Sequence, residues 1–255
     1  MVKAPEQIAS DVTRKALGSS SARNVLQLLF SFSERRVTAT VPDLAELVGI
    51  PVPTAYRHIA LLKDLQLLAE GPIGSYHPTA KVMALARAAQ LANGLADLAR
   101  PVVEEAAAAF NETVMLMQCV GDAVVCVEVK ETQRPMRLTF QRGHTVALGR
   151  GASGKMALAS LPIAAREAFL ATLEHPTLER ELLQISASGF ATSTSEMDDG
   201  VWACSVAVAP YDRAPLVLTV AGPESRFDAR TRESVPDRLM VFAEQLRTVL
   251  ARYAF

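Results

Sequence analysis

A glycine-rich run in the middle of the chain, Gly149 to Lys155, has the GxxxxGK spacing of a phosphate-binding loop. Such a loop also needs a hydroxyl residue after the lysine to hold magnesium, but Met156 stands there, and no apolar strand ending in aspartate is well placed for the metal. A turn that begins a helix is the simpler interpretation, because its free backbone N–H groups would bind a small anion such as a carboxylate. The run therefore favours an anion-binding helix start, with a nucleotide-binding protein or enzyme as the alternative function.

Residues suited to catalysis or metal binding do not occur in supporting patterns. The sequence has no GxSxG motif, and local spacing places no serine or cysteine beside a histidine and an acid. The three cysteines form no CxxC pair, and the four histidines lack HExxH or any paired ligand spacing. We therefore expect no catalytic residue, no metal site and no cofactor.

The composition is that of a globular protein with two domains. Of the 255 residues, 50% are hydrophobic and 21% are charged, and the net charge is −1. This is enough apolar material for packed cores and too little charge imbalance for a disordered chain, and the length favours two domains over one. No apolar stretch is long enough to span a membrane, and residues 1–11 lack the apolar core of a signal peptide. The protein should be cytoplasmic, with no membrane partner.

The first third of the chain has the pattern of a winged helix-turn-helix at residues 20–78, after a mobile arm at residues 1–19. A first helix is expected from Ala22, and a brief strand at residues 36–40. A second helix has Pro42 in its first turn and ends at Gly49.

A third helix begins at Pro53, almost where the second ends. Its inward face is expected to carry Ala55, Ile59, Leu62 and Gln66. Two short helices joined in this way form a helix-turn-helix, whose second member can enter the major groove of DNA. Strands at residues 67–69 and 75–77, around the turn at residues 71–74, would add the wing.

The outer face of the third helix then presents Pro53, Thr54, Tyr56 and Arg57. Arginine can pair with phosphate or guanine, and threonine and tyrosine can hydrogen-bond to phosphate or base edges. These residues are candidate contacts to double-stranded DNA. The alternative is that Tyr56 and Arg57 merely lie on a surface helix.

The remainder of the chain predicts a linker helix and an α+β domain. Residues 79–100 have a long, alanine-rich helical pattern whose small residues would allow close packing between two copies. Pro101 is expected to restart a helix that ends at Asn111. Residues 101–255 then form the second domain. Its expected elements are strands at 113–120, 123–129, 137–140, 145–148, 201–209 and 216–221, and helices from Ser153, Pro162, Pro176 and Asp228.

Seven runs, in this order and spacing, resemble the IclR family of bacterial transcription regulators. They are residues 22–29, 43–51, 54–59, 152–159, 188–190, 200–203 and 221–223. The resemblance implies an N-terminal winged helix-turn-helix, a linker helix and a GAF-like effector-binding domain. It also implies homodimers, often paired into dimers of dimers, on palindromic operators. Val52 and Pro53 stand where members of the family usually have a lysine and a serine. This chain therefore lacks two polar side chains that the resemblance would lead us to expect as DNA contacts.

The resemblance also carries over the positions of an effector pocket. These are Leu138, Val146, Ala152, Ser153, Ser193, Ala203, Thr219 and Ala221. Members that bind two- or three-carbon keto acids tend to have an acid, a cysteine and serines at the last four positions. This chain has smaller or less polar residues there, so we expect an organic acid or a related polar derivative bulkier than pyruvate, with a ring or branched apolar body.

Together these features predict a DNA-binding protein that regulates a catabolic operon. The regulator is expected to respond to a small molecule and to have no enzymatic activity. A third hypothesis is a dimeric sensor whose winged helix makes only protein contacts.

Overall fold

The computed structural model describes residues 20–33, 36–173, 176–211 and 214–252. The chain forms two compact units that divide between Asn93 and Gly94. In this described part, no helix is long and apolar enough to cross a membrane. The predicted arm at residues 1–19 lies outside the described residues.

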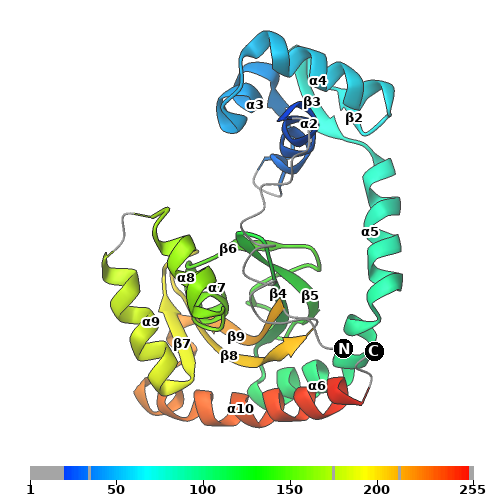
Figure 1. The fold of residues 1–255 in the computed structure, drawn as a ribbon. Coiled ribbons are helices and arrows are strands. Elements are labelled where there is room, and N and C mark those ends of the chain that lie inside the picture. Colours follow the sequence, from blue (N-terminus) through cyan, green and yellow to red (C-terminus); the bar gives the residue numbers. More distant parts are fainter. Residues whose placement is uncertain (1–19, 34–35, 174–175, 212–213, 253–255) are drawn as a thin grey trace, which may run out of the picture. The chain divides into compact units, whose positions relative to one another are not determined.

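The first unit is a winged helix-turn-helix, as predicted (Figure 1). Its elements are α2 (Ser20–Phe30), β1 (Ala39–Thr40), α3 (Val41–Val48), α4 (Val52–Asp64), β2 (Leu68–Glu70), β3 (Ser75–Pro78) and α5 (Ala80–Asn93). The strands form a sheet in the order β1-β3-β2. Leu28, Leu44 and Ala55 are fully buried in the core that joins α2, α3 and α4. Burial of one face of α4 leaves the opposite face exposed.

Local chemistry fixes both ends of α3. The Thr40 hydroxyl accepts the Asp43 backbone N–H at 3.4 Å, and the Asp43 carboxylate accepts the Thr40 backbone N–H at 3.1 Å. The Thr40 hydroxyl also donates to the Asp43 carboxylate at 2.7 Å, and this bond, with the one from the Thr40 backbone N–H, holds the pKa of Asp43 below its usual value. Gly49 ends the helix with a φ of 69°, a left-handed conformation that glycine adopts at little cost. The chain can therefore enter α4 three residues later.

The first unit differs from the sequence prediction in two places. The strand expected at residues 36–40 is only Ala39–Thr40. The α4 helix ends at Asp64, and Gln66 has a φ of 58°, so Gln66 is not part of the inward face of the helix. A left-handed residue cannot continue a right-handed helix, which explains the second difference.

The prediction of a single helix at residues 79–100 is wrong. Gly94 has a φ of 56° and separates α5 from α6 (Leu95–Phe110). The expected restart at Pro101 is also wrong, because Pro101 lies inside α6. The break was not predicted because the helical spacing of apolar residues continues past Gly94. Glycine readily takes the left-handed conformation, so the helix can end there without any change in that pattern. Asn111 ends α6, as predicted.

The second unit is an α+β domain built on one antiparallel sheet. Its strands are β4 (Thr113–Val120), β5 (Ala123–Lys130), β6 (Thr145–Ala147), β7 (Phe190–Thr194), β8 (Val201–Tyr211) and β9 (Ala214–Pro223), in the order β6-β5-β4-β9-β8-β7. The helices that follow α6 are α7 (Gly151–Ala159), α8 (Ile163–Leu170), α9 (Pro176–Ser188) and α10 (Ala229–Ala251).

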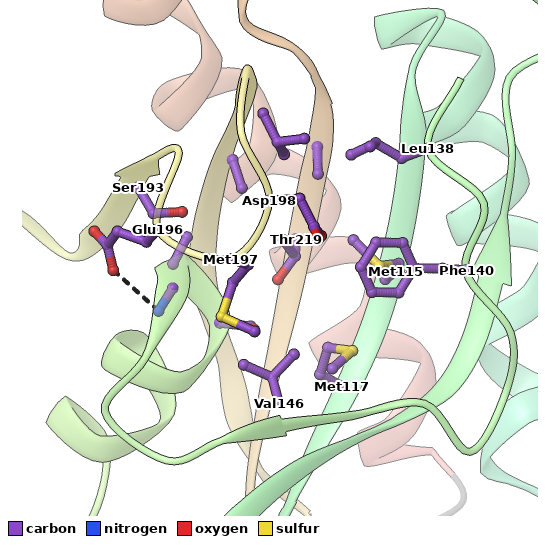
Figure 2. Close-up of a pocket in the computed structure, with 16 residues that line it drawn as sticks. Met115, Met117, Leu138, Phe140, Val146, Ser193, Glu196, Met197, Asp198 and Thr219 are labelled. Carbon is purple, nitrogen blue, oxygen red and sulfur yellow. Dashed lines mark hydrogen bonds between the residues drawn. The ribbon is translucent and has the colours of Figure 1, made fainter. Parts of the chain in front are cut away.

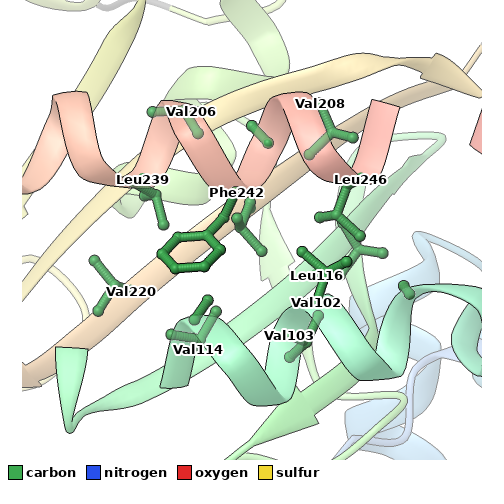
Figure 3. Close-up of a cluster of buried hydrophobic side chains, with 14 of the residues drawn as sticks. Val102, Val103, Val114, Leu116, Val206, Val208, Val220, Leu239, Phe242 and Leu246 are labelled. Carbon is green, nitrogen blue, oxygen red and sulfur yellow. The ribbon is translucent and has the colours of Figure 1, made fainter. Parts of the chain in front are cut away.

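Helices cover both faces of this sheet. On one face, α6 and α10 bury a large apolar cluster that includes Val103, Leu116 and Leu239 (Figures 1 and 3). On the other face, α7 and α9 pack over a second cluster that includes Met117 and Leu158. The second cluster surrounds the predicted effector positions.

The predicted hairpins and helices of the second unit are present, with two differences. Residues 137–140 form no strand, and β7 was not predicted at all. β7 is short, rich in serine and threonine, and pairs with β8 at the edge of the sheet. From sequence alone, such a segment cannot be distinguished from a loop, because its strand conformation depends on pairing with a neighbouring strand.

Candidate functional site

A cavity of about 40 Å³ lies in the second unit, on the face of the sheet that α7 covers (Figure 2). The sheet forms its floor, the start of α7 forms one side, and connecting segments close it. Its lining residues are Met115, Met117, Leu138, Phe140, Val146, Gly151, Ala152, Ser153, Ser193, Glu196, Met197, Asp198, Val201, Ala203, Thr219 and Ala221. The lining is mainly apolar, with polar side chains at the start of α7, in the β7–β8 connection, and at Ser193 and Thr219 on the sheet.

All eight predicted effector positions line this cavity. They are Leu138, Val146, Ala152, Ser153, Ser193, Ala203, Thr219 and Ala221. Strand register explains part of this convergence, because Ser193 on β7 pairs with Ala203 on β8, and Ala203 pairs with Ala221 on β9. Paired residues of neighbouring strands face the same side of a sheet, so these three form one row. Their role in binding an effector stays a prediction.

Several lining residues were not predicted. Met115 and Met117 are alternate residues of β4, so their side chains share a face, and the strand pattern contained that signal. Glu196, Met197 and Asp198 come from the β7–β8 connection. Nothing in the local sequence indicated their position, because β7 itself was not recognised.

Glu196 fills the anion position at the start of α7. Its carboxylate accepts the backbone N–H of Gly151 at 3.1 Å, as Figure 2 shows, and its other oxygen lies 2.5 Å from the Lys155 ammonium. The Arg150 guanidinium also donates to the Glu196 backbone carbonyl at 3.3 Å. A carboxylate is stabilised at a helix N-terminus because the backbone N–H groups point toward it. The sequence predicted that this helix start binds a small anion such as a carboxylate and that the effector is an organic acid, whereas here the chain itself supplies the carboxylate.

The same contacts decide the meaning of the Gly149 to Lys155 run. Lys155 is only 5% exposed, and its ammonium is held between Glu181 at 3.1 Å and Glu196. A lysine placed between two carboxylates is not available to phosphate. Gly149 and Gly151 have φ values of 80° and 59°, left-handed conformations that glycine adopts more easily than other residues, so these glycines are explained by the backbone turn. The run is therefore a helix start, not a nucleotide site.

Thr219 provides one of the few hydroxyl groups of the cavity wall. Its Oγ1 lies 2.7 Å from the Ser205 Oγ within the sheet. Either hydroxyl can donate in this contact. Because a hydroxyl has one donor and two acceptor positions, Thr219 keeps hydrogen-bonding capacity for a ligand.

The predicted DNA contacts lie on the first two turns of α4. Val52, Pro53, Tyr56 and Arg57 are exposed, and Thr54 is half-buried. The inward face contains Ala55, Ile59 and Leu62, as expected. His58 is also buried there, although its position on the inward face was not predicted. The exposed residues form a candidate nucleic-acid surface whose contacts stay a prediction.

Two family models match the chain. The model for the C-terminal domain of the bacterial transcriptional regulator IclR matches residues 88–248, and a helix-turn-helix domain model matches residues 17–70. The chain belongs to the IclR family of transcriptional regulators. This confirms the family that the sequence motifs resembled.

Curated relatives of this IclR-family regulator are themselves regulators. The HTH-type transcriptional regulator TtgV of Pseudomonas putida is 30% identical over 174 residues, which are 64% of this chain and 66% of TtgV. The alignment therefore spans slightly less than two thirds of TtgV. The regulator KipR of Bacillus subtilis is 24% identical over 82% of this chain and 85% of KipR.

Solved structures share the fold of the IclR-family regulator. An IclR-family regulator from Brucella abortus has a TM-score of 0.81 and 20% identity, covering 94% of this chain and 95% of that protein. An IclR homologue from Microbacterium hydrocarbonoxydans, solved in complex with 4-hydroxybenzoate, has a TM-score of 0.65 and 19% identity, covering 91% and 100%. At these identities the likeness establishes the fold.

The IclR-family regulator is not an enzyme, since its domains and relatives are those of transcriptional regulators. Burial raises the pKa of Cys204 to about 12 and raises that of Cys119 above its usual value, so both remain protonated at neutral pH. Among the described residues, no three His, Cys, Asp or Glu side chains gather in a way that would hold a metal ion.

Proposed function

We propose that this regulator binds a small molecule with an aromatic or branched apolar body in the cavity beside α7. Effector binding then changes the affinity of the winged helix for the operator of a catabolic operon. The convergence of all eight carried-over positions on one mainly apolar cavity is the observation that supports the proposal. The protein would act in the cytoplasm, where it meets DNA.

The effector must enlarge the cavity as it binds. A cavity of about 40 Å³ holds a few water molecules, whereas ligand pockets usually measure several hundred cubic ångströms. Three methionines, Met115, Met117 and Met197, contribute to its wall. Methionine is unbranched and changes rotamer easily, so these side chains can move aside for an apolar ring.

The polar end of the effector meets a corner that already contains a carboxylate. Glu196 and Glu181 share Lys155, Asp198 also lines the cavity, and the Arg150 guanidinium contacts the Glu196 backbone, so three carboxylates and two cations lie around this end of the cavity. A further carboxylate would be repelled there unless Glu196 moved away. We therefore propose that an uncharged polar group, such as an amide or a hydroxyl, is the preferred end group.

Calorimetric titration with 4-hydroxybenzamide, 4-hydroxybenzoate and pyruvate tests the effector class. The solved complex of the Microbacterium homologue with 4-hydroxybenzoate shows that a monoaromatic acid binds that relative of the fold, and the amide is its uncharged counterpart. We expect the amide to bind most tightly. Tight binding of pyruvate, with no binding of either aromatic compound, would contradict the proposed pocket.

Glu196→Gln should raise the affinity for 4-hydroxybenzoate about tenfold, because it removes the charge that opposes the acid while keeping a similar shape. The amide should bind about as before. Glu181→Gln is the matched control, since Glu181 also contacts Lys155 but does not line the cavity. An acid affinity that is the same in the wild type and in Glu196→Gln would rule out this role of Glu196.

The DNA-binding part of the proposal rests on the exposed start of α4. We propose that Val52, Pro53, Thr54, Tyr56 and Arg57 meet the major groove. We also propose homodimers, which can pair into dimers of dimers, on a two-fold operator. Three large apolar side chains of α5, Met83, Leu85 and Leu91, are exposed and would suit a contact between copies.

Arg57→Ala should weaken binding to the intergenic DNA beside the regulator's gene by roughly tenfold to 100-fold if the guanidinium pairs with guanine. If it meets a phosphate, the slope of log affinity against log salt should instead fall by about one. Gel-shift measurements at several salt concentrations distinguish these results. Unchanged affinity at every salt concentration would remove Arg57 from the interface.

A further inference from the structure

A buried carboxylate on β5, that of Glu128, binds arginines from two different parts of the second unit. Glu128 is only 2% exposed. Arg142, in the connection between β5 and β6, donates to both carboxylate oxygens, at 2.7 and 2.6 Å. Arg100, on α6, donates to Oε2 at 3.2 Å, and the backbone N–H of Val129 donates to Oε1 at 2.9 Å. One carboxylate thus holds the connection and the helix together.

A β-bulge places Glu128 on the face of the sheet that α6 covers. Strict alternation from Cys126, which belongs to the apolar cluster under α7, would point Glu128 toward the cavity face. Cys126 pairs with Met117 of β4, but the register then shifts, and Glu128 pairs with Leu116. Leu116 belongs to the cluster under α6, and paired residues face the same side of a sheet. The bulge therefore turns Glu128 toward Arg100, as bulges re-aim side chains beside functional sites.

The connection that carries Arg142 also forms part of the cavity wall on the opposite face. Residues 131–144 join β5 to β6, and Leu138 and Phe140 of this connection line the cavity (Figure 2). The Phe140 ring packs edge-on against His144, with 4.6 Å between the ring centroids, so Arg142 lies between two residues that contact each other. A cavity of about 40 Å³ must widen to hold an aromatic ring. Displacement of Phe140 by the effector would therefore pull on Arg142.

Arg100 connects the same carboxylate to the start of α6. It lies in the second turn of that helix and also pairs with Asp97 at 2.6 Å. The helix begins at Leu95, directly after Gly94, where the chain passes from one unit to the other. A buried carboxylate is costly to leave unpaired, so Glu128 would depend more strongly on Arg100 when Arg142 moves away. A change at Arg142 would then be felt at the start of α6.

We propose that Glu128 is the residue through which the effector cavity acts on the start of α6. The proposal rests on the proposed function and adds the route of its regulation. The occupied cavity displaces the β5–β6 connection, Arg142 loosens from Glu128, and Glu128 then holds Arg100 in a changed position. The carboxylate has two arrangements, and the effector favours one of them because its presence in the cavity displaces Phe140.

Arg142→Gln should uncouple DNA binding from the effector. The measured quantity is the ratio of the dissociation constants for the intergenic DNA with and without saturating 4-hydroxybenzamide, or whichever probe of that series the wild type binds best. A wild-type ratio of about tenfold should fall to about twofold or less, because glutamine lacks the charge and the paired N–H groups that hold the buried carboxylate. Arg142→Lys, which keeps the charge, should give an intermediate ratio.

Arg137→Gln is the matched control for this experiment. Arg137 lies in the same connection, and its carboxylate partner is Glu131, at 2.7 Å, so its replacement should leave the ratio as in the wild type. Arg100→Gln should lower the ratio, and combining it with Arg142→Gln should lower the ratio no further, because both arginines act through one carboxylate. Equal ratios in the wild type and in Arg142→Gln, or an equal loss in Arg137→Gln, would overturn the proposal.

Hydrogen exchange measures the same coupling without DNA. Adding the probe should change the exchange of the backbone amides in the first turns of α6 in the wild type but not in Arg142→Gln. Calorimetry should show that Arg142→Gln still binds the probe. Loss of probe binding would overturn the proposal by giving Arg142 a role in the cavity itself, and a lost response in Arg142→Lys equal to that in Arg142→Gln, with equally lowered melting temperatures, would do so by showing a role in folding.

The wild type separates failure of this proposal from failure of the proposed function. A wild type that binds the probe and responds to it on DNA, with unchanged exchange in α6, would overturn the role of Glu128 alone. A wild type that binds neither the probes nor the DNA would contradict the proposed function itself.

Discussion

Gly154→Ala should destabilise the second unit by about 1–3 kcal/mol, the usual cost of forcing an added group into a packed region. In a helix this replacement normally stabilises by about 0.5–1 kcal/mol, because glycine is the more flexible residue. Here a Cβ on Gly154 would collide with the backbone carbonyl oxygen of Ala147 and lie 3.2 Å from the Gly149 nitrogen. The sign of the effect is therefore reversed.

The backbone around Gly154 has little freedom to relieve this collision. Ala147 belongs to β6, and the Gly149 backbone N–H donates to the Gly154 carbonyl at 3.0 Å. Denaturant unfolding of the full chain, followed by a probe of the second unit, measures the change. A free energy of unfolding equal to or above that of the wild type would show that the helix can shift away from β6.

This packing gives a physical reason for the misleading GxxxxGK pattern. Gly149 and Gly151 supply left-handed turns, Gly154 allows close approach of α7 to β6, and Lys155 forms ion pairs with Glu181 and Glu196. Each residue type of the motif is thus required by the fold alone. A sequence motif shows which residues are present, but only their contacts show which chemistry they perform.

Elements with strong local signals were predicted well from the sequence. Pro42 and Gly49 delimit α3, and the turn at Gly121 and Asp122 joins two strands whose apolar content is high. These features act within a few residues and do not depend on tertiary contacts. β7 and the break at Gly94 were missed because the first depends on pairing with β8 and the second interrupts no apolar pattern.

The candidate site was predicted in part, for a related reason. The eight positions that the family resemblance supplied all line the cavity, whereas Glu196 was missed. Glu196 reaches Gly151 across 45 residues of sequence, from a connection whose preceding strand was unrecognised. Its position changes the expected end group of the effector, because the anion expected from the effector is already provided by the chain.

Ala203→Leu should abolish the response of DNA binding to 4-hydroxybenzamide, or to whichever probe of that series the wild type binds best. Ala203 lies between Ser193 and Ala221 in the row of paired residues that lines the cavity, so its side chain faces the cavity. Leucine adds three carbon atoms to a space of about 40 Å³. Since one methylene group changes binding in an apolar pocket by about tenfold or more, the effector's affinity should fall at least 100-fold.

Ala207→Leu is the matched control for this prediction. Ala207 lies on the same strand and the same side of β8, and packs against the same apolar cluster, but does not line the cavity. Both variants should lose some stability through overpacking, but only Ala203→Leu should lose effector binding in calorimetry. In gel-shift experiments without effector, both should bind DNA as the wild type does, because neither residue belongs to the winged helix. Retention of the full effector response in Ala203→Leu would place the effector outside this cavity, since the enlarged side chain and the ligand cannot occupy the same volume.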